Sequence, residues 1–387
     1  MGFCYMLNIL VFTTDCKGHH LEYLHHYYDF ALRDADNHYV FCVSKDFYDV
    51  KSTYSWPEAD NIVFDFIADD DLEKCIKGGN GFLNIIKLSF AKSLFLKKKC
   101  MEHHIDVVQT VMLMEYLPAL PFILPSRIDF RGIIYRIALN DKSLSFRAKI
   151  VERIKYFLLV NSSVFKKVFV LNDKRSVSIL NEKFNTDKFR FLPDPFPQIE
   201  SPKDIRKDLN IPEKNKIFLH FGGLGRRKGT LLIADAISQM KIAKGFTFIF
   251  AGRISKDCDK EFYQILETIN NGAQILVYNE FCTYEFLNSL AYTADYMLIP
   301  YDNVTQSSGV LGYAAQYDKP VIGPDAGLLG DLIRNYRLGK LIKYPITVDD
   351  LLQAVLSYDS IEPVDGSLYR KENSIGKFQQ ILMKIYT

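Results

Sequence analysis

The chain has 387 residues, which at about 150 residues per domain allows two or three domains. Its 48 basic and 46 acidic residues leave a formal net charge of +2, which excludes a polyanion- or nucleic-acid-binding protein driven by bulk charge. Hydrophobic residues make up 48% and charged residues 24%, proportions that exclude a mainly disordered chain. The seven cysteines form no Cys-x-x-Cys pair, which excludes a zinc ribbon and predicts a reduced, cytoplasmic protein.

Two apolar stretches have to be compared with an export signal and with a membrane-spanning segment. The first, at 1–12, lacks a basic start and a small-residue cleavage site, so no export signal is predicted. The second, at 111–125, is interrupted by Glu115, Pro118 and Pro121 well short of about 20 residues. We expect both to be buried strands with their loops.

The N-terminal half alternates short apolar strands with helices. Strands are predicted at 7–12, 38–43, 61–66, 106–109 and 132–135, with a helix at 21–28 and a long lysine-rich helix at 83–99. Each predicted strand is continuously apolar, which is typical of a parallel sheet covered by helices on both faces.

A proline-rich linker is predicted at 192–197, and the same pattern begins again beyond it. Strands are predicted at 216–221, 246–251, 274–277, 296–300 and 320–323, with a helix at 230–240 and a separate amphipathic helix at 374–385. The sequence therefore predicts an α/β protein with two doubly wound domains in tandem, divided near residue 198.

A loop rich in glycine and basic residues lies at 221–230, between a predicted strand and a predicted helix. Gly222 and Gly223 open it, and Arg226, Arg227 and Lys228 follow. Glycines let the backbone approach a ligand, and guanidinium or ammonium groups neutralise phosphate. The spacing matches neither a P-loop nor a Gly-x-Gly-x-x-Gly fingerprint. The alternative interpretation is a tight turn with a solvated basic helix start.

A second candidate anion site follows the strand at 296–300. Ser307, Ser308 and Gly309 stand at the start of a predicted helix, where hydroxyls, free N–H groups and the positive end of the helix dipole favour an anion. The alternative is a simple N-cap by Ser307. Two such helix starts in one doubly wound domain face the same edge of the sheet, so a diphosphate is the expected ligand.

In this order the segments resemble the nucleotide-sugar domain of GT-B glycosyltransferases, in particular the retaining family 4 or "glycosyl transferases group 1" type. The matching segments are a Gly-x-Leu-x3-Lys-Gly loop at 222–229, then 248–252, 281–287, 294–300 and 319–328. The resemblance covers roughly 215–345; the N-terminal half matches only in a glycine loop after its first strand. It implies two Rossmann-like domains facing a central cleft, an acceptor-side domain at 1–198 and a donor-binding domain at 199–370. A final helix at 371–387 would pack back towards the N-terminal domain.

The resemblance also implies an activity. It implies transfer of a hexosyl or other glycosyl group from a nucleoside-diphosphate sugar to a glycan or lipid-linked acceptor, with retention and without a metal or other cofactor. Surface polysaccharide or glycolipid synthesis is common among such enzymes. As the anomeric bond breaks, the leaving diphosphate gains negative charge, which fixed cations and N–H groups stabilise.

The candidate residues fall into three sets. The catalytic candidates are Arg226, Lys228, His19 and His20, the two histidines lying after the first strand, with Glu22 as a partner in proton transfer. The donor diphosphate candidates are Gly222, Gly223, Arg227, Ser307, Ser308 and Gly309. The donor sugar and nucleotide candidates are Gly18, Asp302, Thr305, Gln306, Tyr313, Gly252 and Phe281.

The chain departs from the family pattern at two places. Thr305 and Tyr313 stand where family 4 usually has two glutamates eight positions apart, although 306–309 is similar to a variant segment that also lacks them. Gly223 stands where the family often has a basic residue, directly after the first glycine of the loop. The missing glutamate pair favours an alternative, a catalytically degenerate protein of this fold that binds nucleotide or acts as a structural partner. A sugar-nucleotide epimerase would need several carboxylates in the cleft, and the sequence shows no such cluster.

Two further expectations concern metal and membrane. The nearest carboxylate run, Asp69 to Asp71, is predicted to be a helix start, and no set of side chains with metal-ligand spacing is recognised. The lysine-rich segment 83–99 and the basic segments 147–155 and 166–167 predict contact with an anionic membrane at its inner face. The alternative is a helix packed on its sheet with a solvated lysine face. Asn140 to Lys142 is a further cleft candidate.

Overall fold

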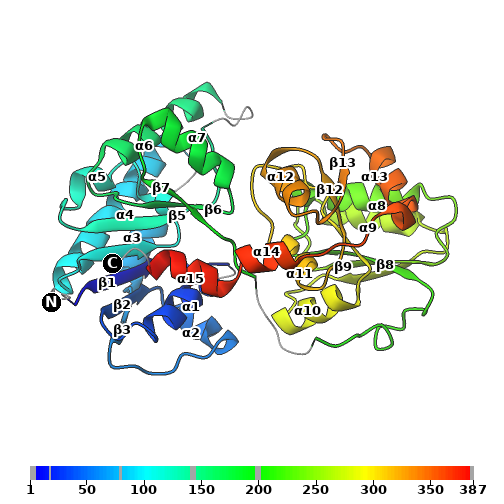
Figure 1. Cartoon of the computed structure of the whole chain (residues 1–387), viewed down its shortest axis with the longest axis horizontal. Helices are drawn as coiled ribbons and strands as arrows, with labels where there is room; N and C mark the ends of the chain where they lie inside the picture. The colour runs from blue at the N-terminus through cyan, green and yellow to red at the C-terminus, as the bar shows by residue number, and fades with distance from the viewer. Residues whose placement is uncertain (1–5, 17–18, 78–80, 140–144, 197–201, 384–387) are drawn as a thin grey trace. The chain divides into compact units, whose positions relative to one another are not determined.

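The computed structural model describes residues 6–16, 19–77, 81–139, 145–196 and 202–383. The chain divides into two compact units, Met1–Leu192 with Gln379–Thr387, and Pro193–Phe378. The sequence had placed this division near residue 198, a few residues later. Each unit contains one parallel β-sheet with helices on both faces, as the doubly wound prediction requires (Figure 1).

The sheet of the first unit has seven parallel strands in the order β3-β2-β1-β4-β5-β6-β7. The chain runs outward from β1 to β3, returns to β4 beside β1, and then runs outward in the opposite direction. The carboxyl ends of β1 and β4 therefore flank the topological switch point, where doubly wound folds bind ligands. The strands are β1 Asn8–Thr13, β2 His38–Val43, β3 Ile62–Phe66, β4 Val107–Thr110, β5 Asp129–Ile134, β6 Val168–Leu171 and β7 Phe189–Leu192.

The helices of the first unit bury one face each against this sheet. Leu10 and Phe12 of β1 pack in one cluster with Leu96 of α4 and Tyr156 of α6, so α4 and α6 cover the same face of the sheet. The helices are α1 His19–Ala31, α2 Phe47–Val50, α3 Asp69–Ile76, α4 Phe82–Glu102, α5 Leu120–Ile123, α6 Phe146–Asn161 and α7 Lys174–Phe184, with 3₁₀ turns η1 Lys51–Thr53 and η2 Leu113–Tyr116.

The sheet of the second unit has six parallel strands in the order β10-β9-β8-β11-β12-β13. Side chains alternate along β8, so Leu219 and Phe221 join one hydrophobic cluster and Phe218 joins another on the opposite face. The strands are β8 Lys216–Phe221, β9 Phe246–Ala251, β10 Gln274–Tyr278, β11 Tyr296–Leu298, β12 Val321–Pro324 and β13 Gly339–Ile342.

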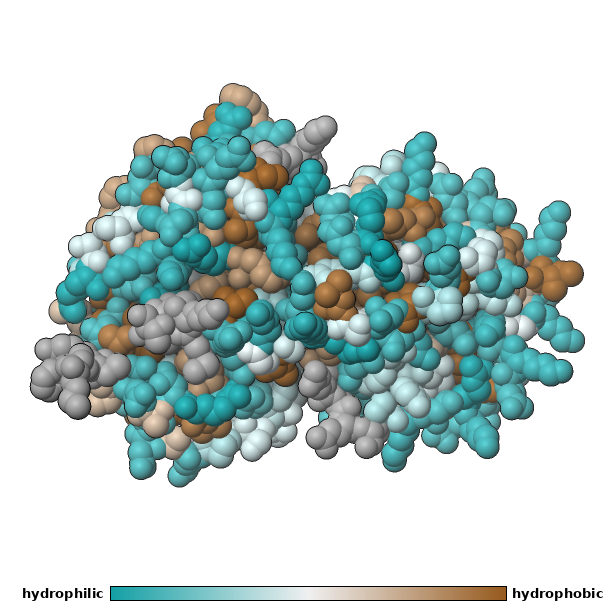
Figure 2. All heavy atoms as spheres, viewed as in Figure 1, coloured by the Kyte–Doolittle hydropathy of each residue, from teal (hydrophilic) through white to brown (hydrophobic). Residues whose placement is uncertain are grey.

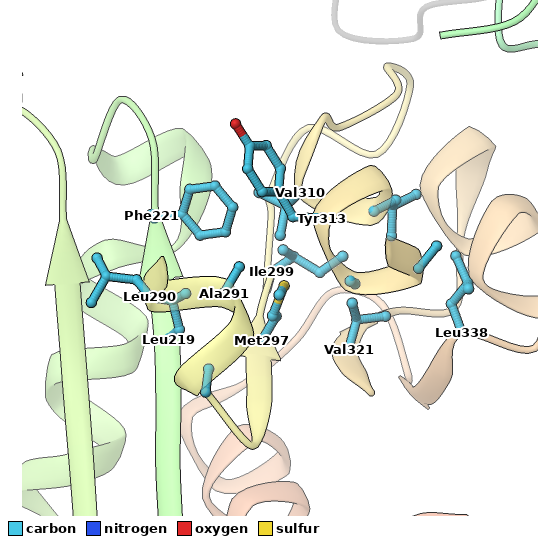
Figure 3. Close-up of a cluster of buried hydrophobic side chains, with 14 of the residues drawn as sticks. Leu219, Phe221, Leu290, Ala291, Met297, Ile299, Val310, Tyr313, Val321 and Leu338 are labelled. Carbon is cyan, nitrogen blue, oxygen red and sulfur yellow. The ribbon is translucent and has the colours of Figure 1, made fainter. Parts of the chain in front are cut away.

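The two clusters of the second unit show which helices cover which face. One, part of which Figure 3 draws, contains residues of α10, α11, α12 and α14. The other contains residues of α8, α9 and α13, and Figure 1 labels all of these helices. These elements are α8 Thr230–Ser238, α9 Asp259–Thr268, α10 Tyr284–Thr293, α11 Val310–Gln316, α12 Gly327–Asn335, α13 Val348–Leu356 and α14 Ser367–Glu372, with 3₁₀ turns η3 Arg226–Lys228 and η4 Tyr358–Ser360.

The last helix, α15 Ile375–Met383, crosses the division between the units. From Gln379 onward it belongs to the first unit, where the Gln379 side chain accepts a hydrogen bond from Arg33, two residues after α1, and donates one to the carbonyl oxygen of His26 in α1. Within the described ranges, no helix combines the length and the apolar character needed to cross a membrane.

Candidate functional site

The loop after β8 folds back over its own first glycine. Gly222 has φ +102°, and a Cβ atom placed there would lie 2.8 Å from Nζ of Lys228, so the ammonium group rests against the Gly222 backbone. Gly229, with φ +73°, ends η3, and a Cβ atom there would overlap the carbonyl oxygen of Pro300. Both positions therefore need glycine for the loop to return Lys228 to the end of β8.

Lys228 carries a charge that the described residues leave unpaired. Its Nζ atom lies 5.3 Å from the ring centroid of Tyr301, a cation–π distance, and no carboxylate among the described residues pairs with it. The hydroxyl of Tyr301 accepts a hydrogen bond of 3.3 Å from Ser308. Tyr301 thus connects the two segments that the sequence selected as anion sites, and the half-buried ammonium beside them favours an anionic ligand.

A buried histidine holds this loop in place. Nδ1 of His220 lies 2.9 Å from the carbonyl oxygen of Leu298, which can only accept, so Nδ1 carries the proton. Nε2 therefore accepts from the Thr230 hydroxyl at 3.1 Å, and Thr230 Oγ1 in turn accepts from the Gly225 amide at 2.9 Å. Burial lowers the pKa of His220 to about 4, and the charge of Lys228 acts in the same direction.

The lowered pKa of His220 predicts acid sensitivity of the second unit, in which it is the only histidine. The unfolded chain binds the proton near pH 6.5 and the folded chain only near pH 4, so the stabilisation is complete above pH 6.5 and is lost as the pH falls towards 4. We expect the free energy of unfolding to fall by about 2 kcal/mol between pH 7 and pH 5. Hydrogen exchange of the β8 and β9 amides measures this, and the variant His220→Gln should lack this part of the pH dependence.

The neighbouring arginines differ in their surroundings. The Arg226 guanidinium pairs with Glu261 of α9 and donates to the Asp257 carbonyl oxygen at 3.0 Å, so it is held against α9. Arg227 is exposed, and its side chain has no hydrogen-bond or ion-pair partner in the described part of the chain. Its carbonyl oxygen accepts from the Asp302 amide at 3.0 Å. Arg227 is therefore available to a ligand, whereas Arg226 already has a counter-ion.

The segment 302–309 is shaped by a side-chain turn. Asn303 Oδ1 accepts from both the amide (3.0 Å) and the hydroxyl (2.8 Å) of Thr305, and Asn303 Nδ2 lies 3.4 Å from Gln306 Oε1. Helix α11 begins at Val310, after Gly309, rather than at the serines. Over the described residues, the amides of Ser308 and Gly309 donate no hydrogen bond, so they remain as N–H donors next to the Tyr301 hydroxyl.

The remaining donor-side candidates that the structure describes each have a different environment. Gly252, with φ +132°, lies so close to Gly222 that a Cβ atom would overlap the Gly222 carbonyl oxygen. Tyr313 is buried, and its ring contacts that of Phe221 edge-on at 5.2 Å with the hydroxyl pointing away from the other labelled side chains (Figure 3). Asp302 accepts from the hydroxyl of Tyr344, and Phe281 is 68% exposed.

A cavity of about 370 Å³ lies in the first unit, at the carboxyl ends of β1 and β4. Its lining includes His20, whose Nδ1 atom is buried without a hydrogen-bond partner among the described residues. It also includes Lys92 and Glu115, which form an ion pair with Lys92 almost fully buried. The cavity therefore occupies the switch point of the first sheet and presents polar groups to a ligand. Glu22, by contrast, lies 4.0 Å from His26 inside α1.

Solved structures of other proteins are similar to this chain over almost its whole length. No family model and no curated protein matches the chain. Among solved structures, HepE of Anabaena in complex with UDP and glucose is 16% identical, with a TM-score of 0.68 over 98% of this chain and 99% of that chain. Sucrose-phosphate synthase from Thermosynechococcus elongatus (13%, TM-score 0.68, 98% of each chain) and WaaG, a glycosyltransferase involved in lipopolysaccharide biosynthesis (13%, TM-score 0.66, 98% and 100%), are similar over equally full lengths.

The chain has the GT-B fold. Its two parallel sheets, of seven and six strands, confirm the predicted fold class. Of the candidate site residues, the GT-B chain brings Gly222, Lys228 and Gly252 into contact and links Lys228 to Ser308 through Tyr301, which sequence analysis had not selected. Gly18, the side chain of His19 and the segment 140–142 lie outside the described residues.

A cluster of potential metal ligands was not predicted from the sequence. Donor atoms of Asp65, Glu102 and His103 lie within 4.8 Å of one another at the junction of β3 and the end of α4. Nζ of Lys99 lies 2.8 Å from Asp65 and 3.1 Å from Glu102, and His103 Nε2 lies 2.8 Å from Asp65. Although burial opposes it, these hydrogen bonds lower the pKa of Asp65. With an ammonium group already on both carboxylates, the cluster fits a network of ion pairs. Asp69 to Asp71 form the first turn of α3.

Proposed function

We propose that this GT-B chain is a glycosyltransferase that moves a sugar from a nucleoside-diphosphate sugar to an acceptor. The observation that carries the proposal is the ammonium group of Lys228, which lies against Gly222 with no carboxylate partner among the described residues. The exposed Arg227 and the amides of Ser308 and Gly309 add further groups for a diphosphate. Complexes of the similar HepE with UDP and with UDP-glucose support a nucleotide sugar as the donor.

The proposed chemistry depends on charge that develops in the transition state. When the anomeric carbon separates from the donor oxygen, the bonding electrons pass to the nucleoside diphosphate, whose negative charge rises. Lys228, held in position by the Gly222 turn and the His220–Thr230 hydrogen bonds, stabilises this charge without moving during the reaction. We infer that transfer needs no metal ion, because fixed cations stabilise the leaving group. Retention is what the resemblance to family 4 implies.

We place the acceptor in the cavity at the switch point of the first sheet. A hydroxyl group of the acceptor can donate a hydrogen bond to the unpaired Nδ1 atom of His20, and the pair of Lys92 and Glu115 can bind further hydroxyls. His20 would then position the attacking oxygen. A glycan or lipid-linked acceptor, used in surface polysaccharide or glycolipid synthesis, would bring such hydroxyls.

Nucleotide binding tests the proposal directly. Thermal unfolding is measured with UDP, GDP, ADP and CMP, each with EDTA and with added Mg²⁺. At about 100 times the dissociation constant, a ligand of the folded state adds about 2.7 kcal/mol of stability, so one nucleoside diphosphate should raise the melting temperature, with or without EDTA. If none of the four changes the melting temperature, the diphosphate site is wrong, and the degenerate alternative replaces the enzyme.

One observation favours that degenerate alternative. Tyr313, at a position where the resemblance expects a carboxylate, packs its ring into the hydrophobic cluster between β8 and α11. Thr305, at the other position, is bound to Asn303. Nucleotide binding without sugar transfer or donor hydrolysis would identify the chain as a non-catalytic nucleotide-binding protein.

We also propose that the first unit contacts an anionic membrane surface. Exposed apolar side chains line α4 and α6, which cover the same face of the sheet, with exposed Lys87, Lys97, Lys98, Arg147 and Arg153 among them. Hydrophobic atoms reach the surface where Figure 1 draws α6 and α7 (Figure 2). The exposed apolar residues are Leu83, Phe90, Leu94 and Met101 of α4 and Phe146, Ile150, Ile154 and Phe157 of α6.

Vesicle binding checks the membrane proposal. We expect the chain to float with phosphatidylglycerol vesicles but not with phosphatidylcholine vesicles, because the cations on α4 and α6 need anionic headgroups. Replacing Phe146 and Phe157 together by serine should weaken binding about tenfold or more, since both rings would be buried in the interface. The variant Phe281→Ser, an exposed phenylalanine of the second unit, is the matched control. Equal binding of the double variant and the wild type would disprove contact through α6.

A further inference from the structure

An aromatic groove lies beside the edge strand of the first sheet, on residues that neither the donor site nor the acceptor cavity uses. It has a volume of about 590 Å³, within the range of roughly 300–1,000 Å³ typical of small-molecule sites. β3 is the outermost strand of the sheet, and its alternate residues Phe64 and Phe66 form the floor. Tyr48 and Trp56, from the segment between β2 and β3, complete the aromatic lining.

The rings of this groove are fixed in position. The Phe66 ring stacks on Tyr48 at 4.6 Å and 24°, and Phe64 lies nearly parallel to Phe66 at 6.0 Å and 12°. Trp56 meets Phe47 edge-on at 4.9 Å, and its indole N–H donates to the carbonyl oxygen of Lys51 at 2.8 Å. Tyr48 is nevertheless 53% exposed, and Trp56 is half-buried. The chain thus holds flat apolar faces rigid and leaves them partly open to solvent.

Charged groups surround these faces. Glu58 and Asp60 are exposed carboxylates on the lining, with no hydrogen-bond or ion-pair partner in the described part of the chain. Nζ of Lys51, also on the lining, lies 5.2 Å from the Tyr48 ring centroid. The groove therefore combines an apolar floor with two acceptors and one donor of hydrogen bonds at its edge.

We propose that this groove binds a glycan chain. A pyranose ring has an apolar C–H face that packs on an aromatic ring, while its hydroxyls donate to carboxylates such as Glu58 and Asp60 and accept from Lys51. An apolar protein segment would bury these three charges without partners, which is costly, and a nucleic acid would meet two carboxylates. A neutral glycan satisfies both parts of the lining.

This inference goes beyond the proposed transfer reaction, because binding here requires neither donor nor catalysis. The groove and the cavity at the switch point share no lining residue. A glycan held in the groove would raise the effective concentration of its remaining length at the first unit. A long acceptor would therefore bind more tightly than its reacting end alone.

Trp56 is the only tryptophan of the chain, so its fluorescence reports on this groove. The full-length protein, without nucleotide, is titrated with maltohexaose, cellohexaose, laminarihexaose and chitohexaose. We expect at least one to change the Trp56 emission saturably. Tyr48→Ala removes the most exposed ring and should weaken this binding about 3- to 10-fold. Tyr263→Ala, which removes a 41% exposed tyrosine of the second unit, should leave it unchanged.

Three results would overturn the inference. The first is that none of the four oligosaccharides changes the Trp56 emission saturably. The second is equal affinity of Tyr48→Ala and the wild type. The third is a Trp56 emission change that depends on protein concentration alone, which would assign the groove to a second copy of the chain. The thermal shift with a nucleoside diphosphate is measured on the same samples. It tests the donor site independently, so failure of one proposal is distinguished from failure of the other.

Discussion

Replacing Lys228 by alanine is expected to lower the rate of sugar transfer about 100- to 1,000-fold, the usual effect of losing one group that stabilises a developing anion. The ammonium lies against Gly222 without a carboxylate partner among the described residues, so its charge is available to the leaving diphosphate. Truncation leaves the Gly222 turn and the His220–Thr230 hydrogen bonds in place. The variant should therefore remain folded, with a smaller thermal shift on adding the nucleoside diphosphate.

Arg226 offers a matched control from the same loop. Its guanidinium pairs with Glu261 and the Asp257 carbonyl oxygen, and because these contacts are exposed, their loss should cost little stability. We expect Arg226→Ala to keep both the nucleotide-induced shift and most of the transfer rate. A large loss in Arg226→Ala together with near-normal transfer in Lys228→Ala would reverse the assignment of the two cations.

Replacing Gly252 by alanine is expected to destabilise the second unit by about 3–5 kcal/mol. The residue has φ +132°, which alanine rarely adopts, and the new Cβ would overlap the carbonyl oxygen of Gly222. Relief of this overlap would have to separate the ends of β8 and β9, where the amide of Gly222 donates to Ala251. Denaturant unfolding measures the loss of stability, and nucleotide binding should weaken in the same variant.

Gly245 separates the two causes of this effect. It also has positive φ, +98°, but a Cβ atom there would meet nothing within 4 Å. Gly245→Ala should therefore cost only the backbone strain, about 1–2 kcal/mol. Equal losses in the two variants would show that close approach of Gly252 to Gly222 does not contribute.

The sequence predicted the central strands of both sheets closely, because continuous apolar runs are specific for buried parallel strands. The observed bounds of β2, β8 and β9 agree with those predicted. Three strands were not predicted. They are β7, whose four residues include Arg190 and precede a run of prolines, and β13, which begins Gly339-Lys340. The third is β6, although all four residues of that strand are buried.

The composition of the loop after β8 predicted a group of cations at the candidate site, but not the direction in which each side chain points. Three consecutive cations suggested a phosphate loop, but they occupy a 3₁₀ turn, in which successive side chains are about 120° apart. Arg226 and Lys228 therefore face different neighbours, which no spacing rule reveals. Tyr301 was missed because a tyrosine after a strand carries no signal, and the Asp65 cluster because its members come from two distant segments.

The path of α15 affects the order in which the two units can finish folding during synthesis. Gln379 belongs to the first unit and bonds to Arg33 and His26, yet it leaves the ribosome only after the whole second unit has been synthesised. The second unit, Pro193–Phe378, is one uninterrupted stretch and can gain its full set of internal contacts first. The first unit is therefore completed only after the second unit has been made, and its completion depends on the last turns of α15.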